Sequence, residues 1–165
     1  MIQQYNNQHF KEVCEIINDG ASAYKGIIPA DRWHEPYMSE KELQIQIDEG
    51  VQFWLYKEEE EIAGVMGIQY KGDVTLIRHA YVRTANRNQG IGKKLLLYLV
   101  SISSTPILIG TWIDATWAIQ FYQKNNFHLV SDSDKEQLLR KYWSIPERQV
   151  ELSVVLASRD WRNDI

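Results

Sequence analysis

The sequence has 165 residues, of which 44% are hydrophobic and 24% are charged, and its formal net charge is -4. This length and balance predict a single domain over residues 1–165 with a packed core, and they exclude a disordered chain. The negative net charge argues against a general nucleic-acid-binding protein, so we expect no nucleic-acid partner.

The first third of the chain predicts a short strand, two helices and one irregular connection. Residues 2–5 alternate weakly, as an edge strand does, and a helix follows them. The segment 24–38 is rich in aromatic residues and interrupted by glycine and proline, which is typical of an irregular connection. Ser39 and Glu42 form a capping box for a second helix that ends near Gly50. The apolar face of the first helix is expected to carry Phe10, Val13, Ile16 and Ile17.

The middle of the chain predicts three strands and the second half alternates helices with strands. The segments 51–58, 62–70 and 73–82 read as an antiparallel meander. The later predicted elements are a helix at 93–102, a strand at 106–113, a helix capped by Asp114, a strand at 127–130, a short helix at 132–143 and a last strand at 149–157.

The single cysteine and the apolar runs bear on the compartment. Cys14 has no partner for an intrachain disulfide, and its apolar neighbours are typical of a buried position. The N-terminal residues lack the pattern of a signal peptide, and the longest apolar run, 95–100, is too short to cross a bilayer. We therefore expect a cytoplasmic protein with no membrane partner.

The segment RNQGIGKK, residues 87–94, places two glycines before an apolar helix. It is not a nucleoside-triphosphate loop, because Arg87 stands where that motif needs glycine and Lys94 where it needs a hydroxyl. It is not a dinucleotide fingerprint either, because Leu95 stands at the third glycine position. Glycines at a helix N-terminus still favour a phosphate ligand. A surface turn that uses its glycines for backbone conformation alone explains this segment equally well.

Two segments in the right order resemble the GNAT superfamily of N-acetyltransferases. Residues 80–96, AYVRTANRNQGIGKKLL, are similar to its acetyl-CoA loop, in which a strand ending in valine precedes Arg/Gln-x-x-Gly-x-Gly/Ala. Residues 117–127, WAIQFYQKNNF, are similar to its second signature, Ala-x-x-Phe-Tyr-x-Lys-x-Gly-Phe. The chain departs from the family at Asn126, which replaces a glycine, and at Ala115, where many members carry an asparagine that contacts the cofactor.

The resemblance implies an α+β fold of three α/β/α layers, the acetyltransferase fold. In that fold a central mixed, mostly antiparallel sheet is flanked by helices, and a splayed strand pair holds the cofactor. The implied cosubstrate is acetyl-CoA, with no metal, and its pantetheine arm would bind the strand end at Tyr81 and Val82. Its pyrophosphate would bind the backbone amides of Arg87, Asn88, Gln89, Gly90, Ile91, Gly92 and Lys93.

The implied reaction is direct attack of a primary amine, from a small molecule or a peptide, on the thioester. Tyr122 matches the family tyrosine that protonates the departing thiolate, although a tyrosine beside Phe121 is also explained by packing alone. The strand before the loop offers Arg78 and His79 and no carboxylate, so the candidate base is His79 or a relayed water.

The resemblance also implies that the segment 24–38, the connection between the first two helices, forms one wall of the acceptor site. Glu35 and Asp31 would attract a cationic amine while Trp33 and Tyr37 pack its carbon skeleton, or the segment is simply an aromatic surface loop. The alternatives in function are a non-catalytic sensor of coenzyme A or acyl-CoA and an enzyme that uses a longer acyl-CoA. An exposed strand edge near 149–157 would support a homodimer.

Overall fold

The computed structural model describes residues 1–163, and its contacts divide the chain into two compact units. The first unit comprises Met1–Tyr70 and Ile77–Ile102. The second unit comprises Lys71–Leu76 and the described residues from Ser103 onward. The single domain over residues 1–165 stays a prediction.

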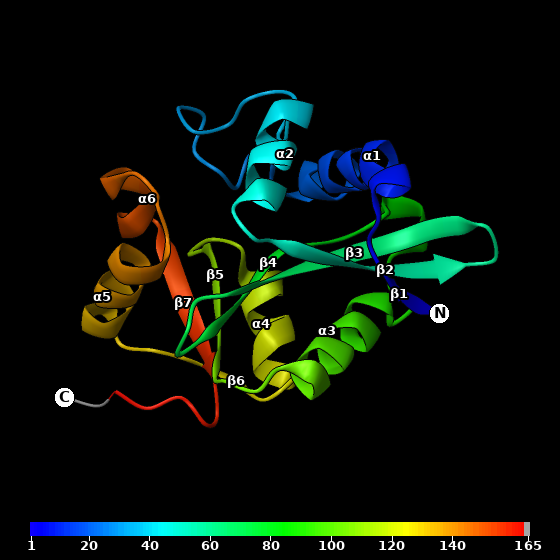
Figure 1. Ribbon diagram of the computed structural model, residues 1–165. Coiled ribbons are helices and arrows are strands. Elements are labelled where there is room, and N and C mark those ends of the chain that lie inside the picture. Colours follow the sequence, from blue (N-terminus) through cyan, green and yellow to red (C-terminus); the bar gives the residue numbers. More distant parts are fainter. Residues whose placement is uncertain (164–165) are drawn as a thin grey trace. The chain divides into compact units, whose positions relative to one another are not determined.

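The first unit is a twisted antiparallel meander with three helices packed on it (Figure 1). Its strands are hydrogen-bonded in the order β1-β2-β3-β4, and β1 and β3 both pair with β2 in antiparallel orientation. Figure 1 shows α1 and α2 on one face of these strands and α3 on the other. The element bounds are β1 Ile2–Gln4, α1 Phe10–Ala21, α2 Glu40–Asp48, β2 Gln52–Glu58, β3 Glu61–Tyr70, β4 Thr75–Val82 and α3 Ile91–Ile102, with short 3-10 helices η1 Asn7–His9, η2 Ser22–Tyr24 and η3 Thr84–Asn86.

The core of the first unit lies between the sheet and the helices α1 and α2. The predicted apolar face of α1 is confirmed, because Val13, Ile16 and Ile17 are fully buried and Phe10 packs against them. Every second residue of a strand faces the same side of the sheet, and strand residues such as Phe53 on β2 complete this core. Burial of so many large aliphatic side chains is the main term that stabilises the unit.

Local capping sets the start of α2. The Ser39 hydroxyl accepts the backbone N–H of Glu42 at 3.1 Å, as the capping signature predicted. The helix ends at Asp48, and Gly50 follows with a φ of 106°, a backbone conformation that side chains rarely adopt. The predicted bounds of α2 are therefore confirmed.

The second unit contains three strands and three helices. The strands are hydrogen-bonded in the order β5-β7-β6, and both pairings are antiparallel. A second core, which includes Leu108, Leu139 and Val155, lies between β5, β7 and α5. The element bounds are β5 Ile107–Trp112, α4 Thr116–Lys124, β6 Phe127–Leu129, α5 Asp132–Tyr142, α6 Glu147–Glu151 and β7 Ser153–Ser158.

Three sequence predictions in the second unit are wrong. The N-cap of α4 is Ala115, with no side-chain hydrogen bond, and not Asp114. The chain forms α6 where the last strand was expected to begin, because Pro146 favours a helix start and the buried Lys135 ammonium donates to the carbonyl of Val150 at 3.0 Å. Strand β7 pairs on both sides, so it presents no exposed edge, and the predicted homodimer loses that basis.

Candidate active site

Two acidic residues of α1 bind segment 83–86 to that helix. The Arg83 guanidinium donates to the carbonyl of Ile62 at 2.8 Å and pairs with Glu12 at 3.5 Å. The Asp19 carboxylate accepts the backbone N–H of Thr84 at 2.7 Å and the Thr84 hydroxyl at 3.1 Å. Asp19 therefore satisfies an N–H at the start of η3, as a capping side chain does, although it lies 65 residues away in sequence.

The glycine turn that follows is exposed and has an unusual backbone conformation. Arg87, Asn88, Gln89 and Gly90 are all exposed, and Asn88 and Gly90 have φ values of 63° and 78°. A Cβ built on Gly90 would meet no heavy atom within 4 Å. The turn thus requires glycine or asparagine for its conformation and leaves open space in front of the helix.

Helix α3 presents its first backbone N–H groups at this turn. The N–H of Lys94 donates to the carbonyl of Gly90 at 3.0 Å, which begins the helical ladder. The amides of Ile91, Gly92 and Lys93 precede that bond, so the helix itself offers them no acceptor. Aligned N–H groups and the helix dipole make this end of α3 suited to an anion such as a phosphate.

A glycine on β3 allows α3 to pack closely against the sheet. A Cβ on Gly64 would lie 2.9 Å from the Ile91 side chain and 3.4 Å from both Leu95 and the carbonyl of Tyr81. Ile91 and Leu95 are buried, so the helix start is fixed by packing while its backbone faces outward. Only a residue without a side chain allows this approach.

The two lysines of the motif differ in their surroundings. Lys94 donates to the Tyr56 hydroxyl at 3.2 Å and lies 5.3 Å above the centre of that ring. Lys93 is exposed. Lys94 is exposed as well, but it has a partner on β2.

The end of β4 is surrounded by aromatic rings. The Tyr81 ring lies 6.3 Å from Tyr24 and 6.2 Å from Tyr37, and both contacts are edge to face. A Cβ on Gly20 of α1 would lie 2.7 Å from the Cβ of Tyr81, so the glycine makes room for this tyrosine. Val82, the next predicted residue, is half-buried at the strand end.

His79 lies on the α2 side of the sheet and not at the turn. Its φ of 55° interrupts the alternation of β4, and its Nε2 lies 3.1 Å from the Oε1 of Gln46 on α2. Its ring centre is 6.1 Å from that of Phe53. Burial, with a smaller effect of the Arg78 charge, lowers the pKa of His79 from 6.5 to about 3. Such a histidine is neutral at pH 7 but a weak base, and its catalytic role stays a prediction.

The structure brings Trp33 and Glu35 together in the predicted acceptor wall. The Trp33 ring stacks on Tyr37 with centres 5.7 Å apart, and its N–H donates to the Glu35 carboxylate at 3.2 Å. Lys25 pairs with the same carboxylate at 3.1 Å. These hydrogen bonds, that of Lys25 first, lower the pKa of Glu35, which is an exposed acid already balanced by a cation.

Tyr122 belongs to the second unit and is buried on α4. Its ring packs edge to face on Phe121 at 5.1 Å and on Phe127 at 6.1 Å. Ala115, which stands at the position of the family asparagine, is fully buried and offers no amide side chain. Asn126 has a φ of 74°, so it adopts the conformation of the glycine it replaces.

Several residues that shape the loop were not predicted from the sequence. They are Asp19, Gly20 and Gly64, whose contacts with the segment 81–91 join distant parts of the chain. A glycine inside a helical pattern usually has a packing reason, so Gly20 carried a usable signal. Asp19 carried none, because its partner is set by tertiary structure.

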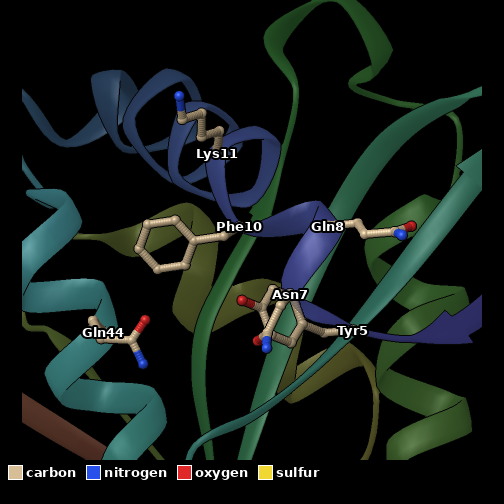
Figure 2. A pocket seen from close by; sticks show the side chains of 6 residues that line it. All are labelled: Tyr5, Asn7, Gln8, Phe10, Lys11 and Gln44. Atoms are coloured by element: carbon tan, nitrogen blue, oxygen red, sulfur yellow. The ribbon is translucent and has the colours of Figure 1, made fainter.

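A separate hollow in the first unit is lined by none of the predicted site residues. It has a volume of about 510 Å³ and lies beside the start of α1 (Figure 2). The hollow is lined by Tyr5, Asn7, Gln8, Phe10, Lys11 and Gln44.

Among residues 1–163, no three His, Cys, Asp or Glu side chains gather as metal ligands would. Over the same residues, no helix is both long enough and apolar enough to cross a membrane.

Comparison with known proteins identifies the family. Residues 49–129 match the sequence model of the acetyltransferase (GNAT) domain. A GNAT-family acetyltransferase from Staphylococcus aureus is 21% identical with a TM-score of 0.68, over 96% of this chain and 97% of that one. The PaiA N-acetyltransferase of Thermoplasma acidophilum, solved with coenzyme A, is 16% identical with a TM-score of 0.73, over 96% of this chain and 97% of that one. The ribosomal-protein-S18-alanine N-acetyltransferase of Escherichia coli is 14% identical with a TM-score of 0.65, over 96% and 92%.

The chain belongs to the GNAT superfamily, as its two motifs predicted. Its fold class is the predicted α+β acetyltransferase fold, in which helices flank a mixed sheet. Its family consists of acetyltransferases whose fold binds acyl-CoA.

Proposed function

We propose that the protein is an acetyl-CoA-dependent N-acetyltransferase in which a primary amine attacks the thioester directly. The observation that carries this proposal is the exposed glycine turn at the start of α3 within a matched GNAT segment. The positive φ at Gly90, the open space in front of it and the first amides of α3, to which the helix itself offers no acceptor, together fit a phosphate ligand.

We assign cofactor binding chiefly to backbone groups. The amides from Arg87 to Lys93, including those of Asn88, Gln89, Gly90, Ile91 and Gly92, would donate to the pyrophosphate of coenzyme A. The strand end at Tyr81 and Val82 would hydrogen-bond the pantetheine arm. Two proteins of similar fold, PaiA of T. acidophilum and the N-acetylglutamate synthase of Neisseria gonorrhoeae, were solved with coenzyme A, which supports the assignment.

The reaction requires one proton to leave the amine and one to reach the departing sulfur. We assign the second task to the Tyr122 hydroxyl, because tyrosine is a competent general acid and this one lies in the matched second motif. For the first task we favour water relayed to solvent over His79, because burial lowers the pKa of that imidazole to about 3. No covalent enzyme intermediate is needed.

The acceptor would meet the wall that contains Trp33, Glu35 and Tyr37. Proteins of similar fold include one named for the alanine of a ribosomal protein and one solved with N-acetyl-glutamate, so both a peptide and a small amine remain within the proposal. We further propose a cytoplasmic location.

The second candidate function is a non-catalytic sensor of coenzyme A or acyl-CoA. The observation in its favour is that β4 offers no carboxylate and that His79 is held neutral by burial. A sensor would keep the glycine turn and dispense with proton transfer.

Release of free thiol from acetyl-CoA distinguishes the two. Purified protein is incubated with acetyl-CoA and a panel of primary amines and short peptides, with acceptor-free reactions as the background. Thiol release that depends on an acceptor, together with an acetylated product of matching mass, supports the enzyme. Saturable acetyl-CoA binding with no release above background for any acceptor favours the sensor.

A further inference from the structure

Arg78 is a half-buried arginine with few partners. One guanidinium nitrogen donates to the Oε1 of Gln69 at 3.1 Å. Among residues 1–163, no carboxylate forms an ion pair with it. A guanidinium carries five N–H donors, so most of its hydrogen-bonding capacity is unused by the described chain.

This arrangement is costly for the fold. Arginine is rarely buried without a partner, because removing a cation from water is unfavourable unless an anion or several acceptors replace the solvent. Burial lowers the pKa of Arg78, and the charge of Glu49 offsets only part of that effect from beyond ion-pair distance. An anion delivered from outside would remove the penalty.

The supporting side chain is itself fixed. Gln69 is buried, and its amide nitrogen donates to the carbonyl of Glu49 at 3.1 Å. That bond leaves the amide oxygen to accept from Arg78 and so orients the guanidinium. A planar fork held in one orientation is the geometry that binds a carboxylate through two parallel hydrogen bonds.

Arg78 lies at the aromatic wall of the predicted acceptor site. Burial raises the pKa of Tyr37, the ring that stacks on Trp33, and the charge of the nearby Arg78 opposes part of that rise. Along β4 it precedes Tyr81 by three residues, about 10 Å at the usual rise of a strand. An amine placed near the strand end by the proposed function therefore has Arg78 within the length of a small molecule.

The charge balance of the wall points the same way. Glu35, the acid predicted to attract a cation, is already paired with Lys25 at 3.1 Å. Arg78 then supplies a positive charge that no carboxylate of residues 1–163 pairs with directly. A polyamine would face this cation, whereas an amine that also carries a carboxylate would complement it.

We infer that Arg78 binds the carboxylate of the acetyl acceptor, so that the acceptor is a small amino carboxylate such as an amino acid. This inference rests on the proposed function, which supplies the amine and the acetyl donor. Arg78 would hold the acceptor without taking part in proton transfer. The alternative is a purely structural role, in which the charge of Arg78 stabilises the C-terminal end of α2 near Glu49.

Equilibrium binding in the presence of saturating coenzyme A tests the inference without requiring turnover. The ligands are the standard amino acids, each compared with its own primary amide, together with putrescine. Because the acid and amide differ only at the carboxylate, we expect at least one acid to bind about tenfold or more tightly than its amide. Amides or putrescine that bind as well as the acids, or acids that do not bind at all, overturn the inference.

Variants locate the preference at Arg78. Arg78→Met should reduce the acid-to-amide ratio to about one while leaving the thermal shift by acetyl-CoA unchanged. Arg140→Met is the matched control, because Arg140 is exposed and already paired with Glu147 at 2.6 Å. A ratio retained in Arg78→Met contradicts the assignment. Acid binding without any acetyl transfer would refute the proposed enzyme but support the carboxylate site at Arg78. Acetyl transfer to amides alone would support the enzyme but refute the carboxylate site.

Discussion

Replacing Gly90 by aspartate tests whether an anion binds in front of α3. Gly90 is exposed with a φ of 78°, and a Cβ there meets no heavy atom within 4 Å. The aspartate side chain would therefore extend into open space without a collision. It would add one negative charge beside the first amides of the helix, where the phosphate is proposed to bind.

The substitution has two effects, one on the stability of the fold and one on the affinity for acetyl-CoA. A left-handed backbone costs an ordinary residue about 1–2 kcal/mol, and this cost falls on folding. A carboxylate about 5 Å from a phosphate charge repels it by about 3 kcal/mol at an effective dielectric constant near 20. Since about 1.4 kcal/mol corresponds to a tenfold change, the charge alone should weaken acetyl-CoA binding about a hundredfold.

Gly90→Asn is the matched control, because asparagine has the shape of aspartate and tolerates a positive φ without the charge. Asn88, two residues earlier, already has a φ of 63°. Calorimetric titration with acetyl-CoA should give a Kd about a hundredfold higher for the aspartate variant than for the asparagine variant. Equal Kd values for the two variants would refute a phosphate at this turn.

Three further predictions concern other parts of the structure. Tyr122→Phe keeps the ring contacts but should lower kcat about a hundredfold with unchanged acetyl-CoA affinity, and an unchanged kcat would remove Tyr122 from the mechanism. Gly64→Ala should destabilise the fold by about 1–3 kcal/mol, because its Cβ would lie 2.9 Å from Ile91, whereas Gly72→Asn in an open turn should have little effect on the melting temperature. His79 has its pKa lowered from 6.5 to about 3, so its stabilising contribution is complete above pH 6.5 and is lost as the pH falls toward 3. Between pH 6 and pH 4, denaturant unfolding should lose about 1.4 kcal/mol more per pH unit in the wild type than in His79→Gln, and equal slopes would contradict this.

Features that depend on residues close together in the sequence were predicted well. The apolar face of α1, the Ser39 cap and the glycine turn before α3 each depend on residues a few positions apart. Local physics therefore determines them before the chain folds. The prediction of the acetyltransferase fold went further because two motifs resembled a known family.

Features that depend on distant contacts were missed or wrong. Residues 149–157 alternate and carry β-branched side chains as a strand does, but the chain is helical as far as Glu151, where the distant Lys135 donates to the carbonyl of Val150. The side of the sheet that His79 faces depends on its positive φ, which alternation alone could not reveal. The carboxylate of Asp19 reaches Thr84 across 65 residues of sequence, so no local pattern identified it as part of the loop.

The central claim is that the turn at residues 87–93 binds coenzyme A. Thermal melting is measured with acetyl-CoA, coenzyme A, ATP and NAD, each at the same concentration. At a hundredfold excess over Kd, a ligand of the folded state adds about 2.7 kcal/mol of stability, which is about 5–10 °C in Tm for a chain of this size. A shift of this order with the two coenzyme A species and not with ATP or NAD is the predicted result. A folded sample whose Tm responds to neither coenzyme A species would contradict both the enzyme and the sensor.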